Sequence, residues 1–210
     1  TNLFAPLGNQ GRGEKWRTPM KMDYLFYMIW GYLSGSILFA YLIPWFMKHI
    51  DIRELSEDKN PGTFNAFVFG GIGCGITVLL LELLKGFLPV YVCCKRLGIQ
   101  SGIFAGVLAA PVAGHAFSVF NRGKGGKGIA VSFGVLLGLI PVWRPVLLLI
   151  AFYLIFSVLL PVKSHLKRSI VTFLCFGGSM LLPELELSLK TGCVLLSAIV
   201  IYKHWEAAME

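Results

Sequence analysis

One segment constrains the fold more than any other: residues 24–46 form a run of 23 residues without a charged side chain. At 1.5 Å per residue, a helix of this length spans roughly 35 Å, which is enough to cross a lipid bilayer. Six further apolar runs follow at about 67–94, 101–120, 128–142, 145–162, 169–183 and 191–202. The sequence therefore predicts an all-α membrane protein with about seven transmembrane helices, several of them short or broken.

The composition also favours a chain embedded in a membrane. Hydrophobic residues make up 56% of the chain and charged residues 14%, whereas an ordinary soluble domain carries roughly 25% charged residues. Too little charge remains to cover a surface that faces water. Residues 1–21 are polar and rich in glycine, so we expect a flexible N-terminal extension there and a single membrane domain over residues 22–210.

The basic residues indicate both the partners and the orientation. No basic face with interleaved aromatic residues occurs, so we expect no nucleic acid but rather membrane lipids and phosphorylated substrates as partners. Outside residues 1–21, ten basic residues lie in the C-terminal tail and the connectors after the first, third and fifth predicted helices, against four on the other side. The positive-inside rule places the side with ten in the cytoplasm.

The densest polar cluster is the fifteen-residue stretch Gly114–Gly128, which ends one apolar run and opens the next. Glycines beside Lys124 and Lys127 allow the backbone to fold closely around a ligand, with N–H groups that can point inward. The next helix is expected to begin near Lys127, so the positive end of its dipole lies at the same place. These features favour a phosphate site, but a flexible positive turn that only follows the charge rule fits the same pattern.

A second polar group lies inside the run 67–94. Glu82 and Lys85 are three residues apart and share a helix face, while Gly86 and Pro89 predict a kink or break close by. Charged residues at membrane depth usually face a partner or an internal cavity. Two interpretations remain open, a structural ion pair and the rim of an active site. The cysteines and histidines lack metal-ligand spacing, so we expect no metal site.

Four motifs, taken together and in order, resemble the bacterial acyl-phosphate:glycerol-3-phosphate acyltransferases, the PlsY family of small seven-helix membrane enzymes. The stretch Gly114–Gly128 is similar to the family pattern GHxxPvFxxFKGGKG, with Ser118 in place of Pro and Gly123 in place of Phe. The other three matches are Tyr32-Leu33-Ser34-Gly35-Ser36-Ile37, Glu82-Leu83-Leu84-Lys85-Gly86 and Tyr202-Lys203-His204-Trp205-Glu206. The resemblance runs from about Met22 to the end of the chain.

The resemblance implies an enzyme of the bacterial plasma membrane with its active site on the cytoplasmic face. It would move a fatty acyl group from acyl phosphate to the sn-1 hydroxyl of glycerol 3-phosphate, giving lysophosphatidic acid without a cofactor. The implied catalytic residues are His115, Ser36 and Asn60, of which we expect His115 mainly to order the loop that follows it. The implied substrate-binding residues are Lys124, Gly125, Gly126, Lys127, Gly128, Arg53, Asn65, Lys85 and His204, with structural roles for Glu82 and Glu206.

The first predicted cytoplasmic connector departs from the family pattern. Asp51, Arg53, Asn60, Gly62 and Asn65 match it, but Glu57-Asp58-Lys59 stands in place of Gly-Ser-Gly and Val68 in place of an arginine. Two carboxylates that faced a phosphate pocket would repel a phosphate. An alternative therefore stays open: a divergent enzyme with another acyl acceptor, or a membrane protein that binds lipid or phosphate without catalysis.

Overall fold

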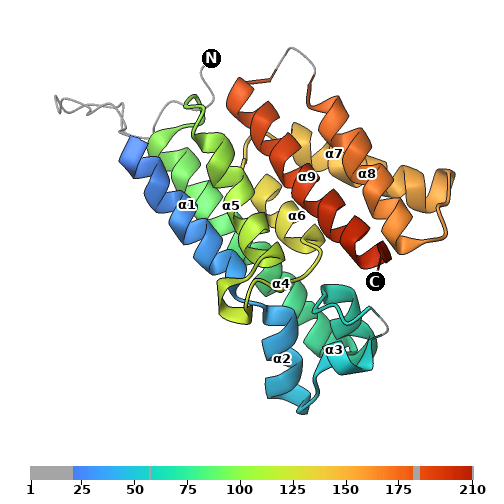
Figure 1. Cartoon of the computed structure of the whole chain (residues 1–210). Helices are drawn as coiled ribbons and strands as arrows, with labels where there is room; N and C mark the ends of the chain where they lie inside the picture. The colour runs from blue at the N-terminus through green and yellow to red at the C-terminus, as the bar shows by residue number, and fades with distance from the viewer. Residues whose placement is uncertain (1–20, 57, 182–184, 210) are drawn as a thin grey trace.

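The computed structural model of the protein describes residues 21–56, 58–181 and 185–209. Every regular element in these ranges is helical, which confirms the predicted all-α class (Figure 1). The extension predicted for residues 1–21 lies outside the described residues except for Lys21, which begins the first helix. The α-helices are α1 (Lys21–Ser36), α2 (Phe39–Lys48), α3 (Ile52–Leu55), α4 (Thr63–Leu97), α5 (Phe104–Ala116), α6 (Ile129–Leu137), α7 (Arg144–Leu154), α8 (His165–Ser179) and α9 (Leu187–Met209).

Each of the seven predicted apolar runs contains a helix. Large apolar side chains on the outside of the bundle remain exposed, among them Ile72, Leu80 and Val158, as expected of helices whose outer faces meet lipid. By length and composition, four segments of the described chain can cross a membrane, and Arg144–Leu159 is a shorter apolar helix. The four are Lys21–Lys48, Thr63–Leu97, Phe104–Asn121 and Leu187–Met209.

The second predicted run is broken, but the break lies at a different residue. Gly71 has a φ of 81° inside α4, a conformation that glycine adopts far more readily than other residues. The predicted break near Gly86 and Pro89 is wrong in position, since both residues lie inside the continuous helix that follows Gly71. Lys85, next to Gly86, forms an ion pair with Glu82 on the same helix, so its charge does not interrupt the helix.

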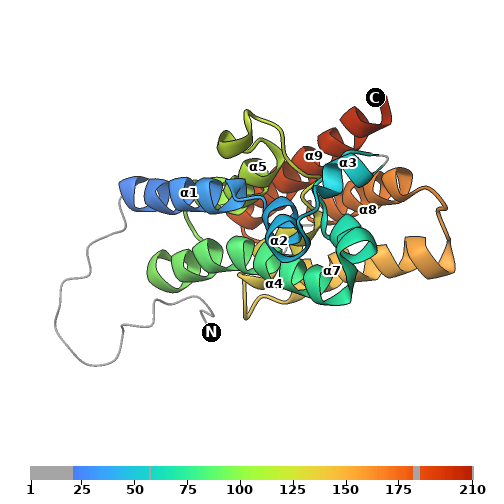
Figure 2. The same cartoon turned by 90° about the horizontal axis from the view of Figure 1, so that it is seen from below.

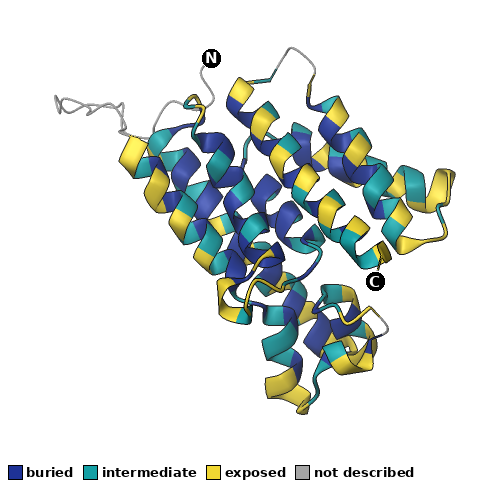
Figure 3. Cartoon of the chain, viewed as in Figure 1, coloured by how far each residue is buried: buried dark blue, intermediate teal, exposed yellow. Residues whose placement is uncertain are grey.

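The helices form one bundle around α5, which packs against α1 on one side and α9 on the other. Seen from below, α5 and α9 lie on one side of the bundle and α4 and α7 on the other (Figure 2). The interior between them is buried and apolar, with Phe104, Leu108, Phe173 and Leu196 among its fully buried side chains (Figure 3).

A smaller group of elements lies at the lower end of the bundle in Figure 1. There α2, α3 and the first turns of α4 enclose a separate apolar cluster that includes Ala40, Ile52 and Ala66. The connector after α5, the first turn of α8 and the C-terminal turn of α9 point to the same end. Segments that are far apart in sequence therefore gather at one end of the bundle, and the candidate site lies there.

Candidate functional site

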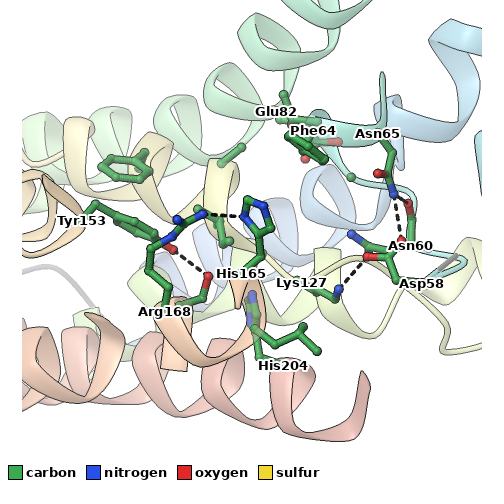
Figure 4. A pocket seen from close by; sticks show the side chains of 18 of the residues that line it. Asp58, Asn60, Phe64, Asn65, Glu82, Lys127, Tyr153, His165, Arg168 and His204 are labelled. Carbon is green, nitrogen blue, oxygen red and sulfur yellow. Dashed lines mark hydrogen bonds and ion pairs between the residues drawn. The ribbon is translucent and has the colours of Figure 1, made fainter. Parts of the chain in front are cut away.

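Two cavities adjoin at this end of the bundle. The first, which we call the apolar cavity, has a volume of about 450 Å³ and reaches between α4, α6, α7 and α8. Its apolar wall consists of Leu79, Ile129, Ala130, Phe133 and Leu166, with Phe64 at the start of α4. Its polar lining residues are Asp58, Asn60, Thr63, Asn65, Glu82, His115, Lys127, Tyr153, Ser157, His165, Arg168, Ser169 and His204 (Figure 4).

The second cavity, which we call the basic cavity, has a volume of about 690 Å³. Of the described residues, four lysines and two carboxylates line it, together with glycines of the loop after α5. Asp58, Asn60 and Lys127 belong to both cavities and form the junction between them. The described residues that line it are Asp58, Lys59, Asn60, Phe117, Gly123, Lys124, Gly125, Lys127, Lys203, Glu206 and Ala207.

Asp58 occupies this junction. Its Oδ2 lies 2.7 Å from Nζ of Lys127, and its Oδ1 accepts hydrogen bonds from the Asn65 side-chain amide at 3.0 Å and the Asn60 backbone N–H at 3.3 Å. Burial raises the pKa of Asp58, but the hydrogen bonds from Lys127 and Asn65 outweigh burial and lower it. The carboxylate is therefore charged at neutral pH, and it neutralises Lys127.

The loop after α5, residues 122–128, is folded tightly onto His115. The backbone N–H of Gly126 donates to the carbonyl oxygen of His115 at 3.0 Å. A Cβ atom at Gly125 would lie 1.9 Å from that same oxygen, so only glycine fits there. The glycines make their close backbone approach to His115 itself, so the predicted binding of a ligand by this loop stays a prediction. Lys124 and Lys127 of the loop line the cavities.

Three buried titratable residues, Glu82, Lys85 and His115, lie in contact with one another, and His115 connects them to this loop. Glu82, Lys85 and His115 are exposed by only 1%, 5% and 5%. Nζ of Lys85 lies 2.8 Å from Oε2 of Glu82 and 3.0 Å from Nδ1 of His115, and it donates to the Ile37 carbonyl at 2.6 Å. Glu82 and His115 also line the apolar cavity. Glu82 therefore has two roles in the structure: it forms a buried ion pair with Lys85, and it lines the apolar cavity.

Ser36 and Arg53 lie outside both cavities. The Ser36 hydroxyl is fully buried and donates to the Tyr32 carbonyl of its own helix at 2.9 Å. Arg53 pairs with Asp51 at 2.6 Å and lies over the ring of Tyr41 at 3.9 Å. Lys85 and Gly126 also lie outside both cavities. The predicted residues that the structure brings to the cavities are Asn60, Asn65, Glu82, His115, Lys124, Gly125, Lys127, Gly128, His204 and Glu206.

Several lining residues were not predicted as part of a site. Lys203 lines the basic cavity and pairs with Glu206 one turn later. Tyr153 of α7 and His165, Arg168 and Ser169 of α8 line the apolar cavity, where the Tyr153 hydroxyl donates to Ser169 Oγ at 3.3 Å. For the three α8 residues, the sequence signal was their spacing. Arg168 and Ser169 follow His165 by three and four residues, so all three share one helix face.

Comparisons with known proteins agree on one family. A family model described as glycerol-3-phosphate acyltransferase matches residues 25–209. The glycerol-3-phosphate acyltransferase of Fusobacterium nucleatum is 32% identical over 188 residues, covering 87% of this chain and 91% of the relative. That of Aquifex aeolicus is 30% identical over 185 residues, covering 88% of this chain and 93% of the relative.

The fold is likewise similar to solved structures. The crystal structure of PlsY, an integral membrane glycerol 3-phosphate acyltransferase, in its glycerol 3-phosphate form has a TM-score of 0.77 and 29% identity, covering 89% of this chain and 90% of PlsY. The lysophosphatidic acid form has a TM-score of 0.74 and 27% identity, with the same coverage.

Proposed function

Because this chain belongs to the glycerol-3-phosphate acyltransferase family, we propose that it moves a fatty acyl group from acyl phosphate to the sn-1 hydroxyl of glycerol 3-phosphate. The product is lysophosphatidic acid, a precursor of phospholipids. The observation that carries the proposal is the junction at Asp58, Asn60 and Lys127, where an apolar and a basic cavity meet. Such a junction suits a reaction between an amphiphilic donor and a small water-soluble anion.

The chemistry asks mainly for positioning and charge stabilisation. The acceptor hydroxyl oxygen forms a bond to the acyl carbon, the bond from that carbon to the phosphate oxygen breaks, and the hydroxyl proton ends on the released phosphate. Phosphate is a good leaving group, so holding the two substrates together and balancing their charge contributes most of the rate enhancement.

The residues around the basic cavity supply that charge. Lys124, Lys127 and Lys203 line it, and lysine ammonium groups bind phosphate oxygens through charge-assisted hydrogen bonds. Asn60 at the junction and Asn65 in the adjoining apolar cavity orient the acceptor. His115 acts as a positioning residue, because its carbonyl holds Gly126 and its ring is fixed by the pair Glu82–Lys85.

Both cavities are placed at the cytoplasmic membrane face in this proposal. The connector that contains Arg122 and the first turn of α8, which contains Lys167, lie at the same end of the bundle as the cavities, and the positive-inside rule assigns such basic residues to the cytoplasm. We expect cysteines placed at positions 122 and 167, in a protein without the five native cysteines, to react with an impermeant thiol reagent only from the cytoplasmic side. Labelling of position 122 from outside would contradict this placement.

The activity itself is tested with the purified protein in detergent. Incubation with palmitoyl phosphate and labelled glycerol 3-phosphate should yield labelled lysophosphatidic acid and one equivalent of inorganic phosphate. Parallel reactions with glycerol and with other phosphorylated polyols test the acceptor. Transfer to one of these but not to glycerol 3-phosphate would replace the proposed acceptor, and absence of transfer to any of them would contradict catalysis.

A further inference from the structure

We propose that Arg168 and His165, at the start of α8, bind a phosphate group of one of the two phosphorylated substrates inside the apolar cavity. The inference rests on the proposed acyl transfer, because that reaction brings two phosphate groups into adjoining cavities. The site is separate from the loop at residues 122–128 and comes from a helix on the other side of the apolar cavity (Figure 4).

The first observation is the charge balance of the cavity. Among the described residues, two carboxylates line it, those of Asp58 and Glu82. Asp58 is paired with Lys127 at 2.7 Å, and Glu82 is paired with Lys85 at 2.8 Å. Arg168 lines the same cavity, and no carboxylate of the described residues forms an ion pair with it. Among the described lining residues, the Arg168 guanidinium is therefore a positive charge without a carboxylate partner, and it is available to bind an anion.

The second observation is the surroundings of that charge. Arg168 is partly buried, and Phe133, Tyr153 and Leu166 contribute to the same wall. Attraction between a guanidinium and an anion is stronger in such surroundings than in open water. The planar guanidinium also presents two parallel N–H groups, which match two oxygens of a phosphate group.

The third observation is the orientation of His165. Arginine can only donate hydrogen bonds, so the contact between its Nη2 and His165 Nδ1 makes Nδ1 the acceptor. The neutral ring then carries its proton on Nε2, which remains a donor for a ligand. The ring packs against Phe64 of α4 with centroids 5.4 Å apart, and Phe64 precedes Asn65 at the junction. His165 is exposed to solvent, and its ring contact with Phe64 connects α8 to the start of α4.

The apolar walls favour the acyl phosphate as the ligand. The cavity wall includes Leu79, Phe133 and Leu166, and the exposed residues Leu154 and Val158 adjoin the lining residues Tyr153 and Ser157 in sequence. An acyl chain fits these surroundings, whereas free glycerol 3-phosphate fits the basic cavity. Donor and acceptor both carry a phosphate dianion, so the kinetics of each substrate must be measured separately to identify which phosphate Arg168 binds.

The test compares Arg168→Ala with Lys167→Ala in detergent-solubilised full-length protein. Lys167 is exposed and lies outside both cavities, so it controls for loss of one positive charge at the start of α8. We expect Arg168→Ala to raise the KM of one substrate about ten- to hundred-fold, as for the loss of charge-assisted hydrogen bonds. Lys167→Ala should leave both KM values unchanged. A rise in the palmitoyl phosphate KM identifies the donor phosphate, and a rise in the glycerol 3-phosphate KM identifies the acceptor phosphate.

The inference is overturned if Arg168→Ala keeps both KM values within about twofold of the wild type. Arg168→Gln retains most of the side-chain volume and therefore controls for misfolding of the alanine variant. Arg168→Lys should restore part of the lost affinity because it keeps the charge.

A direct binding measurement separates this inference from the proposed activity. Palmitoyl phosphate or glycerol 3-phosphate should raise the unfolding temperature of the wild type more than that of Arg168→Gln, even if no product forms. Equal shifts in both proteins, or none in the wild type, would contradict the site.

Discussion

Two cations of the described chain, Lys127 and Arg168, line the apolar cavity, and they differ in how far they are free to bind a ligand. Lys127 belongs to the Gly/Lys motif after α5, and the carboxylate of Asp58 lies 2.7 Å from its ammonium group. Arg168 belongs to no recognised motif, and among the described residues its polar contact is the neutral nitrogen of His165. A motif therefore indicates where a binding group lies, whereas the neighbouring charges decide whether that group is available.

Asp58 accepts hydrogen bonds from the same donors that a substrate phosphate would need. Lys127, the Asn65 amide and the Asn60 backbone N–H all donate to its two oxygens. A phosphate that binds at the junction must displace this carboxylate or bind beside it. Asp58 takes the place of the serine in the Gly-Ser-Gly of the family pattern, so the departure lies at the junction itself.

The largest effect is expected where a partner carboxylate is removed from a deeply buried lysine. Glu82→Ala leaves Lys85, at 5% exposure, without its carboxylate partner, and its remaining hydrogen-bond contacts are to the Ile37 carbonyl and His115. Breaking a buried pair in this way typically costs about 3–5 kcal/mol of unfolding free energy. Denaturant unfolding in micelles measures the change, with Glu54→Ala on the exposed surface of α3 as the control. A loss below about 1 kcal/mol would show that Lys85 finds another partner.

Removal of Lys127 should have the next largest effect, on catalysis rather than on stability. Lys127→Ala removes a phosphate-binding cation and also leaves the Asp58 carboxylate without its partner at the junction. We expect kcat/KM to fall by about hundred-fold, or about 3 kcal/mol in the transition-state free energy.

Lys124→Ala serves as the comparison for that variant. Lys124 is exposed and lines the basic cavity alone, so its removal should lower kcat/KM by only about tenfold or less. The double variant Asp58→Ala/Lys127→Ala should recover part of the loss. Equal losses at both lysines, with no recovery in the double variant, would contradict the importance of the Asp58–Lys127 pair.

The sequence predicted the helices well, because apolar runs long enough to span a bilayer have few alternatives to a helix. The position of the break in α4 was not predictable from charge or proline. It depends on the positive φ of Gly71, one of several glycines in that stretch. Gly86 and Pro89 gave the stronger local signal, yet the helix continues through both.

The candidate site was predicted only where the residues belong to a motif. The loop after α5 brings Lys124 and Lys127 to the cavities as expected. Ser36 and Arg53 lie outside them. The Ser36 hydroxyl donates to the Tyr32 carbonyl, and Arg53 forms an ion pair with Asp51. The α8 residues were missed because their placement depends on packing between distant segments, such as the contact of His165 with Phe64.

The central claim is that Asp58 occupies the anion position at the junction of the two cavities. Its most direct test is the KM for glycerol 3-phosphate of Asp58→Asn, which keeps the shape and removes the charge. Nζ of Lys127 is then free to bind a phosphate oxygen, and we expect the KM to fall by about three- to tenfold, as for one hydrogen bond. An unchanged or higher KM, in a variant that unfolds at the wild-type temperature, would contradict the claim.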